Sequence, residues 1–64
     1  MLTYVTGELN LQDCMVFTAF INDEIGVEYE VDSYEEDVYT VTVYELTNAE
    51  TNKLRFFELK NFQG

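Results

Sequence analysis

The alternation of residues between Val27 and Leu46 is the feature that most constrains the fold of this chain. Apolar and acidic residues alternate without a break over positions 27–32, with acids at Glu28, Glu30 and Asp32. Side chains two apart on a β-strand point to the same face, so this pattern predicts a strand with one apolar face and one acidic face. Positions 33–37 (SYEED) predict an acidic turn, and Val38–Leu46 predicts the returning strand of a hairpin.

A strand and a helix are predicted before this hairpin. Met1–Thr6 is rich in β-branched and aromatic residues and predicts a strand that Gly7 ends. A helix is predicted from Leu11 to about Glu24, because Asn10 can cap it and Gly26 stands where a C-terminal glycine would end it. Its apolar run is also compatible with a buried strand, in which case the fold would be a small all-β barrel.

After the hairpin, Thr47–Asn52 (TNAETN) has the composition of a turn, and Lys53–Phe62 predicts a last strand. The apolar residues of this last segment occur in both strand phases, which indicates a bulge or a strand that is apolar on both faces. The expected order is β-α-β-β-β. The sequence thus predicts one small α+β domain over residues 1–64, with an antiparallel sheet and one helix packed on its apolar face.

Charge is distributed unevenly along the chain. The formal net charge is −10, and all three basic residues lie within positions 53–64, whereas positions 1–52 hold twelve of the thirteen acids. Such a field repels nucleic acid and anionic membranes and attracts basic protein surfaces. The alternative interpretation is that the acids only keep a small protein in solution.

Few residues of the chain are equipped for chemistry. There is no histidine and one cysteine, Cys14, which lies in the most apolar part of the predicted helix. A thiol without a histidine partner predicts a core residue, and Ser33 has no base placed by a motif. Three scattered glycines form no phosphate-binding loop. We therefore expect neither catalysis nor a cofactor, and the single cysteine favours a reducing compartment, the cytoplasm.

The abundant carboxylates allow two further readings. Paired acids can hydrolyse glycosides, but so short a chain encloses no substrate cleft. The acids of positions 32–37 offer oxygen ligands for calcium, yet their spacing does not match the known calcium loop and the turning glycine is missing. A solvated acidic turn is therefore the preferred interpretation, and no metal is expected.

The remaining candidate site is a surface that binds a protein partner. Carboxylates two apart on a strand repeat every ~6.6 Å, an approximate imitation of a nucleic-acid backbone with its charge every ~3.4 Å along each strand. Exposed tyrosines would add contact area. The predicted partner-binding residues are Glu28, Glu30, Asp32, Tyr34, Glu35, Glu36, Asp37 and Tyr44.

In size, acidity and lack of catalytic groups, the whole chain resembles the small phage-encoded inhibitors of the anti-CRISPR and DNA-mimic type. No sequence motif carries this resemblance, and acidic immunity proteins and antitoxins share the same features. The resemblance implies an inhibitor that acts in the host cytoplasm on a basic nucleic-acid-binding protein, without binding nucleic acid itself. A structural or oligomerisation module is the alternative, and a homodimer would help to stabilise so small a domain.

Overall fold

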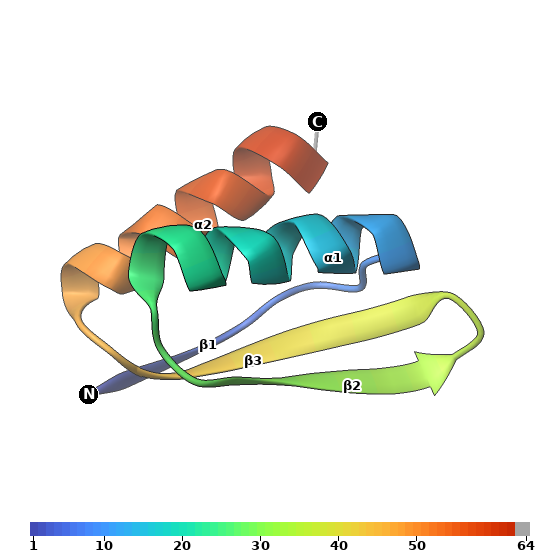
Figure 1. Ribbon diagram of the computed structural model, residues 1–64, viewed down its shortest axis with the longest axis horizontal. Coiled ribbons are helices and arrows are strands. Elements are labelled where there is room, and N and C mark those ends of the chain that lie inside the picture. Colours follow the sequence, from blue (N-terminus) through green and yellow to red (C-terminus); the bar gives the residue numbers. More distant parts are fainter. Residues whose placement is uncertain (63–64) are drawn as a thin grey trace.

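A computed structural model describes residues 1–62 and has two layers, a sheet and a pair of helices (Figure 1). The elements are β1 (Leu2–Val5), α1 (Leu11–Phe20), a π-helical turn η1 (Ile21–Ile25), β2 (Tyr29–Glu35), β3 (Val38–Leu46) and α2 (Asn48–Phe62). Both helices lie on the same side of the sheet. The α+β class, the antiparallel sheet and the helix packed on one of its faces are confirmed, and a second helix replaces the expected last strand.

The sheet has the strand order β1-β3-β2, and both pairings are antiparallel. β3 is therefore the central strand, and β2 has one free edge. Beyond β1 the chain continues along β3, where Leu9 exchanges two backbone hydrogen bonds of 2.8 Å with Tyr39. The hairpin turn is tighter than the sequence predicted, because positions 33–35 belong to β2 and only Glu36 and Asp37 form the turn.

A bulge near the end of β3 places its last apolar residue in the core. The register between β1 and β3 shifts between Leu2 and Tyr4, opposite Glu45, whose φ of 57° is left-handed. In a regular strand Val43 and Leu46 would point to opposite faces. Because the bulge inserts one residue, both are fully buried on the helix side of the sheet.

The first helix forms as its sequence predicted. The Asn10 side chain accepts a hydrogen bond of 2.8 Å from the Asp13 N–H, which is an N-cap. The helix continues through the π-helical turn η1 and ends at Gly26, whose φ of 74° is left-handed. The chain then enters β2 directly, so the all-β alternative is wrong.

The prediction of a strand over Lys53–Phe62 and of a turn over Thr47–Asn52 is also wrong, because α2 spans both. Thr47 and Glu50 form a capping box: the Glu50 N–H donates to the Thr47 hydroxyl at 3.2 Å, and the Thr47 N–H donates to the Glu50 carboxylate at 2.9 Å. Helical spacing then brings Leu54 and Phe57 to the core side. The two apolar phases that suggested a bulged strand are the signature of this helix.

The core lies between the two layers. Phe17 of α1, Ile21 of η1 and Leu54 of α2 are fully buried against the valines of β3. Phe20 stacks on Phe57 with ring centroids 4.0 Å apart, which joins the two helices. Such ring pairs contribute about 0.5–1.5 kcal/mol beyond the burial of their area.

One carboxylate is buried between the sheet and the helices. Glu58 of α2 is 4% exposed and accepts hydrogen bonds from the Tyr4 hydroxyl and, at 2.8 Å, from the Gly7 N–H. Two donors compensate for its lost hydration, since a buried polar group without partners is costly. Glu58 thereby connects α2 to the end of β1.

Candidate interface on the outer face of the sheet

The face of the sheet that points away from both helices carries the predicted acidic row. The register aligns Glu30 with Thr42 and Asp32 with Thr40, and the inward residues Val41 and Val43 are fully buried. Glu28 lies next to β3 at the start of the hairpin, where its carbonyl accepts a hydrogen bond of 3.2 Å from the Tyr44 N–H. Glu28, Glu30 and Asp32 are all exposed on this outer face.

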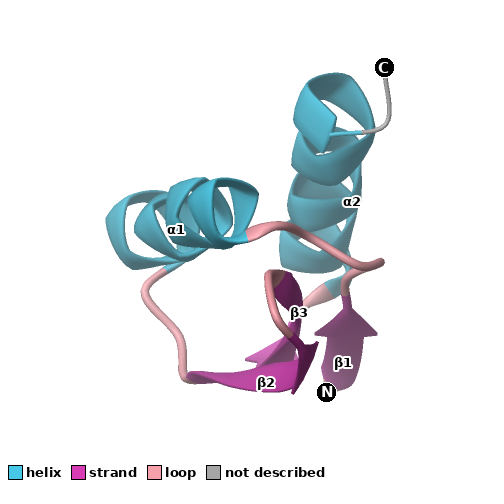
Figure 2. Cartoon of the chain, turned by 90° about the vertical axis from the view of Figure 1, so that its right-hand side faces the viewer, coloured by secondary structure: helices cyan, strands magenta, loops and turns pink. Residues whose placement is uncertain are grey.

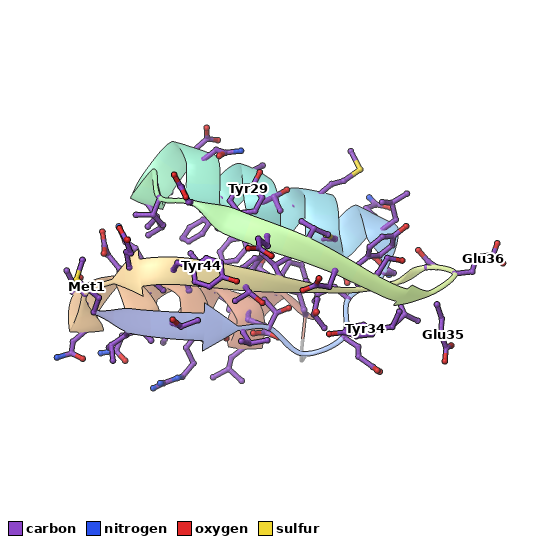
Figure 3. All side chains as sticks on the ribbon, turned by 90° about the horizontal axis from the view of Figure 1, so that it is seen from below. Met1, Tyr29, Tyr34, Glu35, Glu36 and Tyr44 are labelled. Atoms are coloured by element: carbon purple, nitrogen blue, oxygen red, sulfur yellow. The ribbon has the colours of Figure 1, made fainter. Side chains whose placement is uncertain are left out.

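Tyr34 extends the acidic row toward the hairpin turn. It lies two residues beyond Asp32 on β2 and is 68% exposed. Figure 3, which views the sheet from its outer face, places Tyr34, Glu35 and Glu36 together at the turn and Tyr44 toward the opposite end. Glu28, Glu30 and Asp32 therefore lie in one line, and Tyr34 follows them where the register of β2 with β3 shifts between Ser33 and Glu35. Together with Tyr44 these four residues are called the acidic face below.

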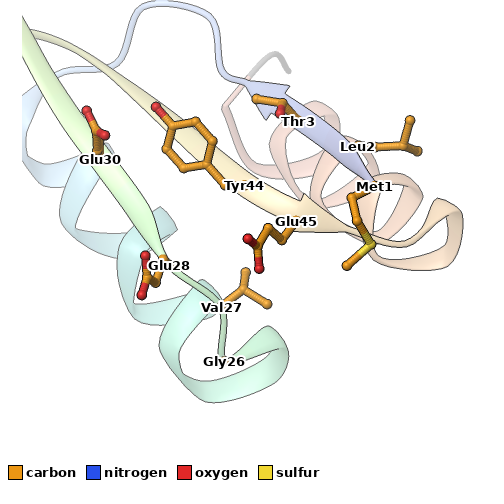
Figure 4. Close-up of a pocket in the computed structure, with 9 residues that line it drawn as sticks. All are labelled: Met1, Leu2, Thr3, Gly26, Val27, Glu28, Glu30, Tyr44 and Glu45. Atoms are coloured by element: carbon orange, nitrogen blue, oxygen red, sulfur yellow. The ribbon is translucent and has the colours of Figure 1, made fainter.

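The pKa of Tyr44 shows the effect of the neighbouring carboxylates on this face. Partial desolvation, followed by the charge of Glu30 and a hydrogen bond to it and by the charge of Asp32, raises the pKa of the Tyr44 phenol. The neighbouring carboxylates have this effect because they oppose a further negative charge. The hydroxyl end of the ring points toward Glu30 (Figure 4). The acidic face thus combines a negative potential with a half-buried aromatic ring.

Asp37 has a different position from the other predicted residues. Its carboxylate accepts a hydrogen bond of 2.7 Å from the Leu11 N–H, at the first turn of α1. Its φ of 60° is left-handed, a conformation that Asp adopts more readily than most residues. Asp37 therefore attaches the hairpin turn to the positive end of the helix dipole. Glu35, the last residue of β2, and Glu36 of the turn are exposed.

The fold adds residues to this face that sequence reasoning did not identify. A hollow of about 660 Å³ opens at the end of the sheet that is farthest from the hairpin turn (Figure 4). It is lined by the N-terminal residues, the segment that leads into β2 and the end of β3: Met1, Leu2, Thr3, Gly26, Val27, Glu28, Glu30, Tyr44 and Glu45. Only the pairing of β1 with β3 brings the N-terminal residues there, and no local sequence pattern predicts that pairing.

The side chains that could take part in chemistry, the Cys14 thiol and the Ser33 hydroxyl, are held in structural contacts. Cys14 is buried, and burial raises the pKa of its thiol, which disfavours the reactive thiolate. The Ser33 hydroxyl donates to the Glu35 carbonyl at 3.3 Å. Within residues 1–62, no three His, Cys, Asp or Glu side chains are grouped as a metal site would require, and no helix is long and apolar enough to cross a membrane.

Three comparisons with known proteins complete the description of the site. No protein-family model, no curated protein and no solved structure matches the chain.

Proposed function

We propose that this protein is an inhibitor that binds a basic nucleic-acid-binding protein and occupies the site where that protein holds DNA or RNA. The observation that supports the proposal is the acidic face. Glu28, Glu30 and Asp32 line one strand with Tyr34 and Tyr44 beside them, and no helix within residues 1–62 covers them. The mechanism is non-catalytic: carboxylates take the place of phosphates against lysine and arginine side chains, and the tyrosines supply contact area.

The distribution of charge supports the same partner. The three basic residues Lys53, Arg55 and Lys60 belong to α2, on the opposite side of the sheet from the acidic face. No lysine or arginine in positions 1–52 neutralises the acids there. The long-range field of such a surface accelerates encounter with a basic target and weakens with salt. A phage-encoded inhibitor of a host defence complex, acting in the host cytoplasm, would have these properties.

The experiment compares the parent chain with Glu28→Lys/Glu30→Lys. Each immobilised chain is exposed to lysate, a retained protein is purified, and the displacement of its labelled DNA or RNA by the free chain is measured. The parent should displace the nucleic acid, with an affinity that falls steeply as salt rises. The double variant changes the acidic face by four charge units and should lose displacement, since these outward side chains are exposed and tolerate lysine.

The matched control is Asp23→Lys/Glu24→Lys, which makes the same charge change in η1, within the helix layer. It should retain most of the displacement. If both double variants lost displacement equally, net charge alone would explain binding. If Glu28→Lys/Glu30→Lys displaced nucleic acid as well as the parent, the proposal would be refuted.

A second candidate function, self-association, is favoured by exposed apolar residues of α2. Phe56 is 70% exposed and Leu59 is 54% exposed. Large exposed apolar side chains side by side on a small domain are typical of interfaces. Sedimentation equilibrium of the parent and of Phe56→Ser tests this candidate: a dimer that Phe56→Ser dissociates supports it, whereas a monomeric parent excludes it.

A further inference from the structure

The free edge of β2 presents unpaired backbone groups beside the acidic face. The Tyr44 N–H bonds to the Glu28 carbonyl, and hydrogen bonds of an antiparallel pair alternate along the strand. The backbone groups of Glu28, Glu30 and Asp32 therefore point toward β3. Those of the intervening residues Tyr29, Val31 and Ser33 point away from β3, to the side where the described part of the chain adds no further strand.

An apolar shelf lies next to this edge, on the inner side of the sheet. α1 lies on the β2 side of the sheet and α2 on the β1 side (Figures 2 and 3). Asn22 contacts the Tyr29 hydroxyl at 3.4 Å, which shows the side of the helix that faces β2. Leu11 and Met15 belong to the same helical stripe as Asn22. They are 49% and 63% exposed, and Val31 of β2 is 45% exposed.

The edge and the shelf together have the form of a strand-binding site. A strand added to β2 would pair with Tyr29, Val31 and Ser33, and every second side chain would turn inward to cover Leu11, Met15 and Val31. The other side chains would lie on the outer face, opposite Glu28, Glu30 and Asp32. Cross-strand neighbours lie only ~4.5–5.5 Å apart, so opposite charges there are favourable and like charges are not.

We infer that β2 binds an extended segment of the partner protein as an added strand, in which basic and apolar residues alternate. A second copy of this chain is a poor occupant, because β2 against β2 would set two rows of carboxylates side by side. The inference rests on the proposed function for the basic character of the partner. It adds that recognition requires backbone pairing at one edge, which charge imitation alone does not require.

The test uses a defined peptide and the whole chain. The peptide has seven residues, the length of β2, with lysine and valine alternating and both ends blocked. Amide hydrogen exchange is followed residue by residue by NMR. The peptide should slow exchange at Tyr29, Val31 and Ser33 by about tenfold or more, whereas the Glu30 and Asp32 amides are protected by β3 without it.

Two control peptides separate pairing from charge. One has the same composition with the lysines grouped together. The other is the alternating peptide with N-methyl groups on the backbone edge that would pair with β2. Each should bind about tenfold or more weakly than the alternating peptide. Equal binding of the three peptides, or binding that leaves exchange at the three outward amides unchanged, would overturn the inference.

Val31→Pro provides the matching change in the protein. Proline removes the outward N–H and no bond to β3, a substitution that edge strands tolerate. It should abolish binding of the alternating peptide, while Val31→Thr should retain it. The two proposals fail separately: normal nucleic-acid displacement by Glu28→Lys/Glu30→Lys refutes the imitation of phosphates, whereas unprotected edge amides refute strand addition. If Val31→Pro is unfolded, the exchange data on the parent chain decide.

Discussion

The buried carboxylate of Glu58 provides the most direct test of how this small core is stabilised. Tyr4→Phe removes the hydrogen bond from the Tyr4 hydroxyl and leaves that from the Gly7 N–H in place. A hydrogen bond to a charged acceptor contributes about 1.5–3 kcal/mol. Since Tyr4 is only half-buried, we expect a loss of about 1.5 kcal/mol at pH 7. For a domain of this size, that loss lowers Tm by roughly 6–12 °C.

The pH dependence of this loss identifies its cause. Burial, then the hydrogen bond and the charge of Glu58, raise the pKa of Tyr4 well above its ordinary value of 10.0, against a smaller opposing effect of Arg55. The folded state therefore keeps a proton that the unfolded chain loses above pH 10. This contribution to stability is complete below pH 10 and is lost as pH rises further. Phenylalanine cannot ionise and makes no such contribution.

The difference in stability between parent and Tyr4→Phe should accordingly shrink at alkaline pH. By pH 11 the shrinkage is at most about 1.4 kcal/mol, the equivalent of one pKa unit, and about 1 kcal/mol with solvent screening of a partly exposed hydroxyl. Urea unfolding followed by circular dichroism at pH 7, 10 and 11 measures it. Tyr34→Phe, at a tyrosine that is 68% exposed, is the control. An equal cost of Tyr4→Phe at pH 7 and pH 11 would refute the reasoning.

Two further predictions concern the helices. Thr47→Ala removes one half of the capping box of α2 and should cost about 1 kcal/mol in urea unfolding; a loss below a few tenths would show that the box is not needed. Cys14→Ala should cost about 1–2 kcal/mol by emptying part of the core and should leave partner binding intact. A thiol reagent should label native Cys14 slowly and unfolded Cys14 quickly, and rapid native labelling would contradict its buried position.

Local patterns predicted most of the elements correctly. The alternation over positions 27–32 set the two faces of β2, because a strand repeats every two residues whatever surrounds it. Asn10 and Gly26 marked the ends of the first helical segment, because the Asn10 side chain and the Gly26 N–H each bond to a backbone group only three to five residues away. The acidic row over Glu28, Glu30 and Asp32 followed directly from the same alternation.

The last third of the chain shows how two local signals can compete. TNAETN has the composition of a turn, but Thr47 and Glu50 also have the spacing of a capping box, and the hydrogen bonds of that box are the ones that form. Phe56 and Phe57 are adjacent and so occupy the two strand phases that predict a bulge or a strand that is apolar on both faces. On a helix, Phe57 packs against the core while Phe56 remains 70% exposed, so two adjacent aromatic residues require no bulge.

The sequence by itself determined which residues alternate, where the first helix begins and ends, and that one strand face would be acidic, because these properties depend on neighbours within a few positions. Only the tertiary structure decided which face Leu46 occupies, since that depends on the bulge opposite β1. It also decided the partners of Asp37 and Glu58, each of which bonds to a backbone N–H far away along the chain. The residue type does not reveal whether a carboxylate is buried or exposed, and the fold alone supplies the hydrogen-bond donors that make its burial tolerable.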